Sequence, residues 1–309
     1  MQVQNLFDPS RLRHTKPLFW LALVSAGIAI ALVPLWILDS RQLLGVSVWE
    51  KPIKFYVSAA IFSFTYSWLS SFLIRGERWV KLIGLVIAVS LTVELVVILA
   101  MAGLGQTSHF NVSSPTAIAI WSIMASFISI VLVSTILISL IIIFQKNQDF
   151  NLKLALVFGS VNTAVGMGLA YLMTWPTAEQ LANYQGIAGA HSVGVSDGGP
   201  GLPFLGWSTV AGDLRVGHFF GLHSIQVAAI LLAISLLLPM VFRVPLIVVG
   251  NTTWLGFVGL VTWQSLRAEP FASPSALTLS GFATLLAIAA LSFALLVMAQ
   301  SRSKSKKLP

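Results

Sequence analysis

Four of the five histidines in the chain fall on the same side of the membrane in the topology derived below, and this grouping is the main indication of chemistry. The four are His109, His191, His218 and His223. Histidine serves as a metal ligand, a haem ligand or an acid–base group. We therefore predict an outward-facing site for haem b or a metal ion. His223 and His109 are the preferred ligands, followed by His218 and His191.

Three polar side chains lie at similar depth inside apolar segments. At 1.5 Å of rise per residue, Glu94 and Gln226 lie about 13 Å from the outer ends of their segments, and His223 about 9 Å. His223 and Gln226 share a helix face with Phe219, because the spacing is i, i+4, i+7. An ionisable group inside a membrane normally faces a partner or a cavity. We predict one pocket lined by Glu94, His223 and Gln226, with Glu94 as the catalytic, proton-handling group; alternatively, a protonated Glu94 joins two helices by a hydrogen bond.

The residues around His218 limit the chemistry of this site. His218 and His223 are about 140° apart around a regular helix, so one metal ion reaches both only if His218 precedes the helix. Asp213 and Arg215 come just before it, and we expect them to order the adjoining loop or to bind an anionic group of the ligand. The G-x-S-x-G pattern at 194–198 lacks the strand and helix that a serine nucleophile needs.

The composition is that of a multi-pass membrane protein. Hydrophobic residues make up 57% of the chain and charged residues 9%, against roughly 45–50% and 25% in soluble domains. The absence of cysteine excludes disulfides and iron–sulfur clusters. A bilayer core requires about 20 apolar residues as a helix, and we predict an all-α bundle of eight transmembrane helices. The predicted spans are 18–38, 55–74, 79–103, 116–144, 153–175, 217–240, 244–266 and 277–299.

The distribution of lysine and arginine predicts the orientation. Five of the 18 lie at the outer ends of the spans and the other 13 at the inner ends when both termini are cytoplasmic, as the positive-inside rule requires. We expect a bacterial inner membrane protein with a cytoplasmic basic arm at 1–17, a transmembrane domain at 18–300 and a cytoplasmic basic tail at 301–309. Membrane lipids account for the charge of the tail, so no nucleic-acid partner is expected.

A cap and an internal repeat are also predicted. The loop 176–216 is rich in glycine and proline but carries aromatic residues, which favours a folded outer cap. Lys51-Pro-Ile-Lys54-Phe55 matches Arg215-Val-Gly-His218-Phe219 at an offset of 164, and Gly105-Gln106 matches Ala268-Glu269 at an offset of 163. Near-constant offsets suggest a 4+4 parallel duplication, in which binding sites tend to lie between the halves. Chance matching of so few residues is the alternative.

Two resemblances follow from these motifs. The segment from Asp197 to Gln226, together with Trp49-Glu-Lys-Pro-Ile-Lys-Phe55, resembles uncharacterised bacterial multi-pass integral membrane proteins. That resemblance covers most of the chain and implies no known activity. The size, the 4+4 layout and the outward histidines are similar in architecture to haem A synthase. The Glu-x-x-His-Arg-type ligand motifs of that family are absent.

Three functions remain open at this point. The first is a haem or metal site with a redox or quinone-linked role. The second is a small-solute, proton-coupled transporter, favoured by the repeat and by Glu94, although no span has an obvious glycine or proline break at the midplane. The third is a receptor or assembly factor that binds a partner through the cap. Whether the protein is an enzyme stays undecided, and a homo-oligomer is compatible with the sequence.

Overall fold

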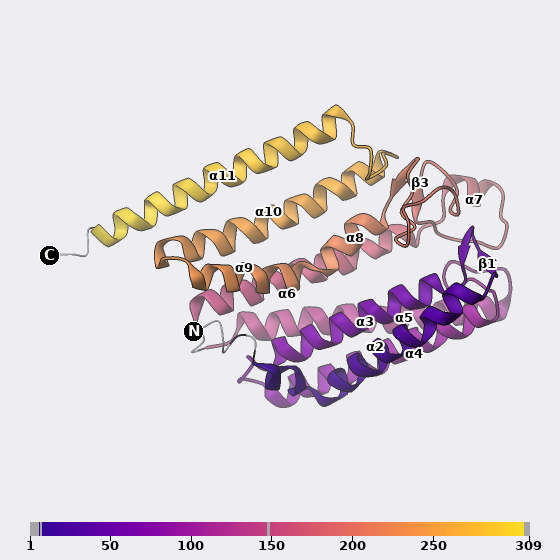
Figure 1. Cartoon of the computed structure of the whole chain (residues 1–309), viewed down its shortest axis with the longest axis horizontal. Helices are drawn as coiled ribbons and strands as arrows, with labels where there is room; N and C mark the ends of the chain where they lie inside the picture. The colour runs from indigo at the N-terminus through magenta and orange to yellow at the C-terminus, as the bar shows by residue number, and fades with distance from the viewer. Residues whose placement is uncertain (1–5, 7, 147–148, 306–309) are drawn as a thin grey trace.

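The computed structural model describes residue 6 and residues 8–146 and 149–305, the side chains of 303–305 excepted. The long helices run roughly along one axis, and many of the connecting loops gather at one end (Figure 1). We call this the cap end. The 3-10 helix η1 (Pro9–Arg13) and the last turns of α11 (Ala276–Ser305) lie at the opposite end, which we call the terminal end.

The elements fall into two sets joined between α5 and α6. The first set comprises α2 (Lys16–Leu38), the hairpin β1 (Gln42–Leu43) and β2 (Val46–Ser47), α3 (Glu50–Ser70), α4 (Glu77–Gly103) and α5 (Pro115–Ile143). The second comprises α6 (Phe150–Gly168), η2 (Leu169–Met173), α8 (Arg215–Leu222), α9 (Ser224–Leu237), α10 (Met240–Leu266) and α11. The cap lies between η2 and α8 and contains α7 (Ala178–Ala182) and the antiparallel pair β3 (Ser192–Val193) and β4 (Gly212–Asp213).

The architecture is a mostly helical bundle of membrane-spanning character. Within the described residues, six helices are long and apolar enough to cross a membrane, and α8 with α9 makes a seventh if the bent pair is one span. The remaining long helix, α3, is less apolar because it carries two lysines and four serines. The predicted helical bundle is therefore present, while crossing by all eight segments stays a prediction.

The two sets of helices resemble each other in packing and in their helix ends. In each set the first helix contacts the second and the third, the second contacts the third, and the third contacts the fourth. Gly105 and Ala268, aligned by the predicted repeat, follow α4 and α10 in the left-handed conformation, with φ of 68° and 57°. The next N–H group, from Gln106 or Glu269, bonds to the carbonyl five residues earlier, which is the Schellman pattern. The duplication stays a prediction, and these similarities agree with it.

The sixth predicted span is broken at His223, where α8 and α9 meet at a bend of 43°. Gly221 of α8 lies so close to Gly166 of α6 that a Cβ on Gly166 would lie 2.2 Å from the carbonyl carbon of Gly221. Past the bend, the N–H of Ile225 donates to Thr163 Oγ1 at 3.1 Å. The sequence showed no obvious glycine or proline break at the midplane of a span, and the bend at His223 lies just past a close contact between two glycines.

Candidate functional site

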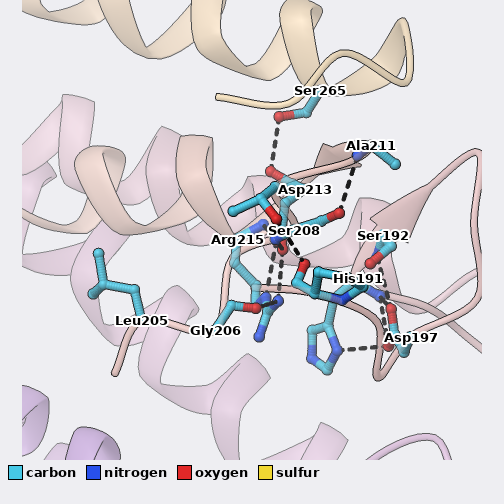
Figure 2. Close-up of polar contacts among 12 residues, drawn as sticks. His191, Ser192, Asp197, Leu205, Gly206, Ser208, Ala211, Asp213, Arg215 and Ser265 are labelled. Atoms are coloured by element: carbon cyan, nitrogen blue, oxygen red, sulfur yellow. Dashed lines mark hydrogen bonds and ion pairs between the residues drawn. The ribbon is translucent and has the colours of Figure 1, made fainter. Parts of the chain in front are cut away.

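The cap is joined to the helices through a buried ion pair (Figure 2). Asp213 is fully buried and accepts hydrogen bonds from Ser208 N–H at 2.9 Å and Arg215 N–H at 3.0 Å. The Arg215 guanidinium donates to the same carboxylate through Nε at 2.9 Å and Nη2 at 2.5 Å, and Nη2 also reaches the Gly206 carbonyl. The Ser265 hydroxyl of α10 donates to the Asp213 carbonyl at 2.7 Å. Asp213 and Arg215 thus connect the cap to α8 and α10.

His191 and Asp197 form a second pair in the cap. His191 Nδ1 lies 2.7 Å from Asp197 Oδ2, and the carboxylate also accepts the backbone N–H groups of His191 and Ser192 (Figure 2). Burial lowers the pKa of His191, although the hydrogen bond to Asp197 opposes this. Burial raises the pKa of Asp197, but the hydrogen bonds from His191 and Ser192 outweigh it and hold that pKa below its usual value. The pair is therefore a neutral imidazole donating to a carboxylate.

His109 contacts a lysine rather than another histidine. Lys51 Nζ, in the first turn of α3, lies 3.2 Å from His109 Nδ1. Because a lysine ammonium only donates, Nδ1 accepts and the proton of the neutral imidazole is on Nε2. Burial, followed by the charge of Lys51, lowers the pKa of His109 well below its usual value. Phe55 and Trp121 lie beside the imidazole, with ring centroids 5.8 and 5.2 Å away.

Two charged groups of α3 meet Arg215 of α8 below the cap. Lys54 Nζ lies 2.8 Å from Glu50 Oε1 and donates to the Leu205 carbonyl at 3.3 Å. A Cβ built on Gly206 would lie 3.6 Å from Glu50 Oε1, 3.6 Å from Lys54 Nζ and 3.7 Å from Arg215 Nη1. The starts of α3 and α8 therefore direct charged groups to one place, where the two sets of helices face each other.

Glu94 and the residues near the break lie deeper in the bundle. Glu94 is 5% exposed, its Oε1 has no hydrogen-bond partner among the described residues, and the charge of Lys51 acts on it. The His223 and Phe219 ring centroids are 4.6 Å apart. Gln226, whose side chain interacts with His223, donates to Thr65 of α3 at 2.9 Å. The structure thus brings His223 and Gln226 together, while Glu94 is linked to Lys51 only through the electrostatic effect of that charge.

The predicted metal ligands do not gather. In the part of the chain that the structure describes, no group of three His, Asp or Glu residues could hold a metal ion. His109 is bound to Lys51, and His191 to Asp197. His218 Nδ1 donates to the Gly166 carbonyl at 2.8 Å. Each of these three histidines is thus occupied at Nδ1 by its own protein partner.

Sequence reasoning treated three residues of this region only as loop charges or as repeat markers. They are Glu50, Lys51 and Lys54 in the first turns of α3. A signal was present, because two lysines at the outer end of a predicted span run against the positive-inside bias. Their role depends on contacts with 109 and 205–215, which lie far away along the chain.

The arrangement combines lysine and arginine side chains, two imidazoles held neutral and a buried carboxylate. Such a set can bind an anion and transfer a proton between Glu94 and its surroundings. No family model, no curated protein and no solved structure matches the chain.

Proposed function

We propose that the protein is a membrane transporter of a small solute, coupled to protons through Glu94. The break between α8 and α9 is the observation that carries this proposal. His223 lies eight residues into the segment that begins with α8, and Glu94 lies nine residues before the end of α4. At 1.5 Å per residue both are about 12–13 Å from the cap ends of their helices. Broken helices near the midplane, in proteins with repeated halves, form the binding sites of many secondary transporters.

The surroundings of Glu94 support a role in proton coupling. Its carboxyl group is buried and has an oxygen without a described hydrogen-bond partner. The charge that acts on it, Lys51, belongs to the group below the cap. A solute that binds near Lys51 would change the electrostatic environment of Glu94, and ionisable residues inside membranes commonly serve such proton relays.

The histidines give less support to a resident cofactor. A metal ion normally takes at least three protein ligands, and no such group is gathered in the described ranges. A haem requires only one or two axial ligands, so the same argument does not apply to it. The visible spectrum of the purified protein tests directly whether a haem is bound. We expect the purified protein to have no Soret band, whether oxidised or reduced with dithionite. A Soret band with sharp reduced α and β bands would favour the haem hypothesis instead.

We also propose that all eight helical segments span a bacterial inner membrane with the terminal end in the cytoplasm. Both described ends of the chain lie on the same side of the bundle (Figure 1), which an even number of spans requires. The predicted excess of lysine and arginine is at this end. The site below the cap would then open to the outside.

The test is proton movement in proteoliposomes. Wild-type protein, Glu94→Gln and Glu77→Gln would be reconstituted with a pH-sensitive dye inside, and neutral, cationic and anionic small solutes would be added outside. Glu77 is a matched control because it is an exposed acid at the other end of the same helix, paired with Lys81. We expect one class of solute to drive proton entry in the wild type and in Glu77→Gln, and not in Glu94→Gln. Unchanged proton entry in Glu94→Gln would overturn the coupling role.

A further inference from the structure

Lys51 differs from the other four basic residues at the cap end. Each of those four has a carboxylate partner. The pairs are Arg41 with Asp39 at 2.7 Å, Lys54 with Glu50 at 2.8 Å, Arg215 with Asp213 at 2.5 Å, and Arg267 with Glu269 at 3.7 Å. The hydrogen-bond partner of Lys51 is the uncharged Nδ1 of His109. Lys51 is a half-buried residue, so among the described residues its ammonium group has no carboxylate bonded to it, and it lacks the full solvation that would replace one.

Lys51 also lies within electrostatic range of two other cations. The charges of Arg215 and Lys54 act unfavourably on it, and the charges of Glu94 and Asp197 act favourably. Glu50 and Asp213 are already bound to Lys54 and Arg215, and Asp197 is bound to His191, so among the described residues Lys51 is the cation of this group without a bonded carboxylate. Three cations held together by a folded protein repel one another, and an anion placed among them relieves that repulsion.

The geometry leaves donors for such an anion. Arg215 uses Nε and Nη2 in its described hydrogen bonds, whereas Nη1 has no acceptor among the described residues. Nη1 also lies near Lys54 Nζ, because a Cβ on Gly206 would be 3.7 Å from the first and 3.6 Å from the second. Lys54 and Arg215 remain 24% and 29% exposed at their side chains. The N–H donors of a guanidinium and two ammonium groups match the acceptor oxygens of a carboxylate or phosphate.

We propose that Lys51, Lys54 and Arg215 bind a small oxyanion, a carboxylate or a phosphate, below the cap. This rests on the proposed transport function and names its substrate class. The bound anion neutralises the charge of Lys51, which otherwise acts favourably on ionised Glu94. Glu94 then accepts a proton, so that anion and proton enter the site together.

The first test is thermal stability in detergent, in a chloride buffer of constant ionic strength. Sodium phosphate and sodium succinate are the probes, and sodium chloride and choline chloride are the controls. We expect one oxyanion to raise Tm by about 5 °C when its concentration is roughly a hundredfold above Kd. No rise above the chloride controls with either probe, up to solubility, would overturn the proposal.

Variants then separate Lys51 from a general effect of charge. Lys51→Met would lose the response to the oxyanion, and it would be at least as stable as the wild type without probe, because an unpaired charge is removed. Lys81→Met changes an exposed lysine outside the site and would keep the full response. A Lys51→Met protein that responds like the wild type would overturn the proposal, and if that variant fails to fold, the probe comparison on the wild type still decides.

Two further results keep this inference separate from the transport proposal. Protection by an oxyanion without any solute-driven proton movement would uphold the anion site and overturn transport. Transport of a neutral or cationic solute without oxyanion protection would uphold transport and overturn the anion site. Micelles containing phosphatidylglycerol test a lipid headgroup as the source of the phosphate. If that lipid alone gives the full, Lys51-dependent rise in Tm, the assignment to a small soluble anion is overturned.

Discussion

The chain contains two Asp-x-Arg pairs with the same geometry and different burial, and they allow a matched test of the cap. In both, the arginine N–H donates to the aspartate at 3.0 Å. The guanidinium Nη2 also donates to the carboxylate, at 2.7 Å in Asp39–Arg41 and 2.5 Å in Asp213–Arg215. The side chains of Asp39 and Arg41 are 21% and 49% exposed, whereas those of Asp213 and Arg215 are 0% and 29% exposed.

The perturbation is Asp213→Asn, with Asp39→Asn as the control. Asparagine keeps one acceptor oxygen, but it removes the charge and turns an NH2 group toward the guanidinium. Breaking a buried ion pair by removing one partner costs about 3–5 kcal/mol. Because Arg215 keeps the Gly206 carbonyl and some contact with water, we expect the lower figure, about 3 kcal/mol. That corresponds to a fall in Tm of roughly 5 °C for a chain of 309 residues.

The assay is thermal unfolding in detergent, with hydrogen exchange of the cap measured at a temperature below the transition. We expect Asp213→Asn to lower Tm and to speed amide exchange in 206–215. Asp39→Asn should shift Tm only slightly, since water replaces the lost interaction of an exposed pair. Equal shifts in the two variants would refute the argument that burial of Asp213 makes its pair the more important one.

Three further outcomes are expected. Stability should fall as the pH is lowered from 7.5 to 5.5. Burial lowers the pKa values of His109 and His191 in the folded protein, so below about pH 6.5 the unfolded chain takes up more protons than the folded one. A constant or rising Tm would contradict this. Gly166→Ala should destabilise by about 1–3 kcal/mol through overpacking against α8, whereas Gly259→Ala, with no atom within 4 Å of its new Cβ, should have little effect on Tm. Because the chain has no cysteine, a cysteine at exposed Val210 should react with an impermeant maleimide in intact cells, and one at Ser301 only after lysis; the opposite pattern would reverse the orientation.

The helical bundle could be predicted from the sequence because its signal is local. Twenty apolar residues in a row specify a helix in lipid whatever the rest of the chain does. The Schellman ends at Gly105 and Ala268 are local too, which explains why the repeat alignment found them. The weak point was α3, which packs against α2 and α4 although it carries two lysines and four serines.

The candidate site was predicted less well because its contacts are long-range. Histidines grouped on one side of the membrane do not have to approach one another, and here each of three is bound at Nδ1 to a different partner. The break at His223 lies beside the contact of Gly221 with Gly166, which is more than fifty residues away along the chain. No periodicity or spacing within one segment encodes such a pairing.

The short helix α8 is held at both ends, and this restricts how the proposed site opens. At its start, Arg215 is bound to Asp213, which Ser265 of α10 also contacts. One turn later a Cβ on Gly217 would lie 2.0 Å from Thr262 Oγ1 of α10, and near its end Gly221 lies against α6. Such close contacts leave α8 no room to slide alone. Under the transport proposal, α8 therefore moves as one body with α6 and α10, relative to α2–α5. The contacts that must then change are those from α3, such as Lys54 to the Leu205 carbonyl and Thr65 to Gln226.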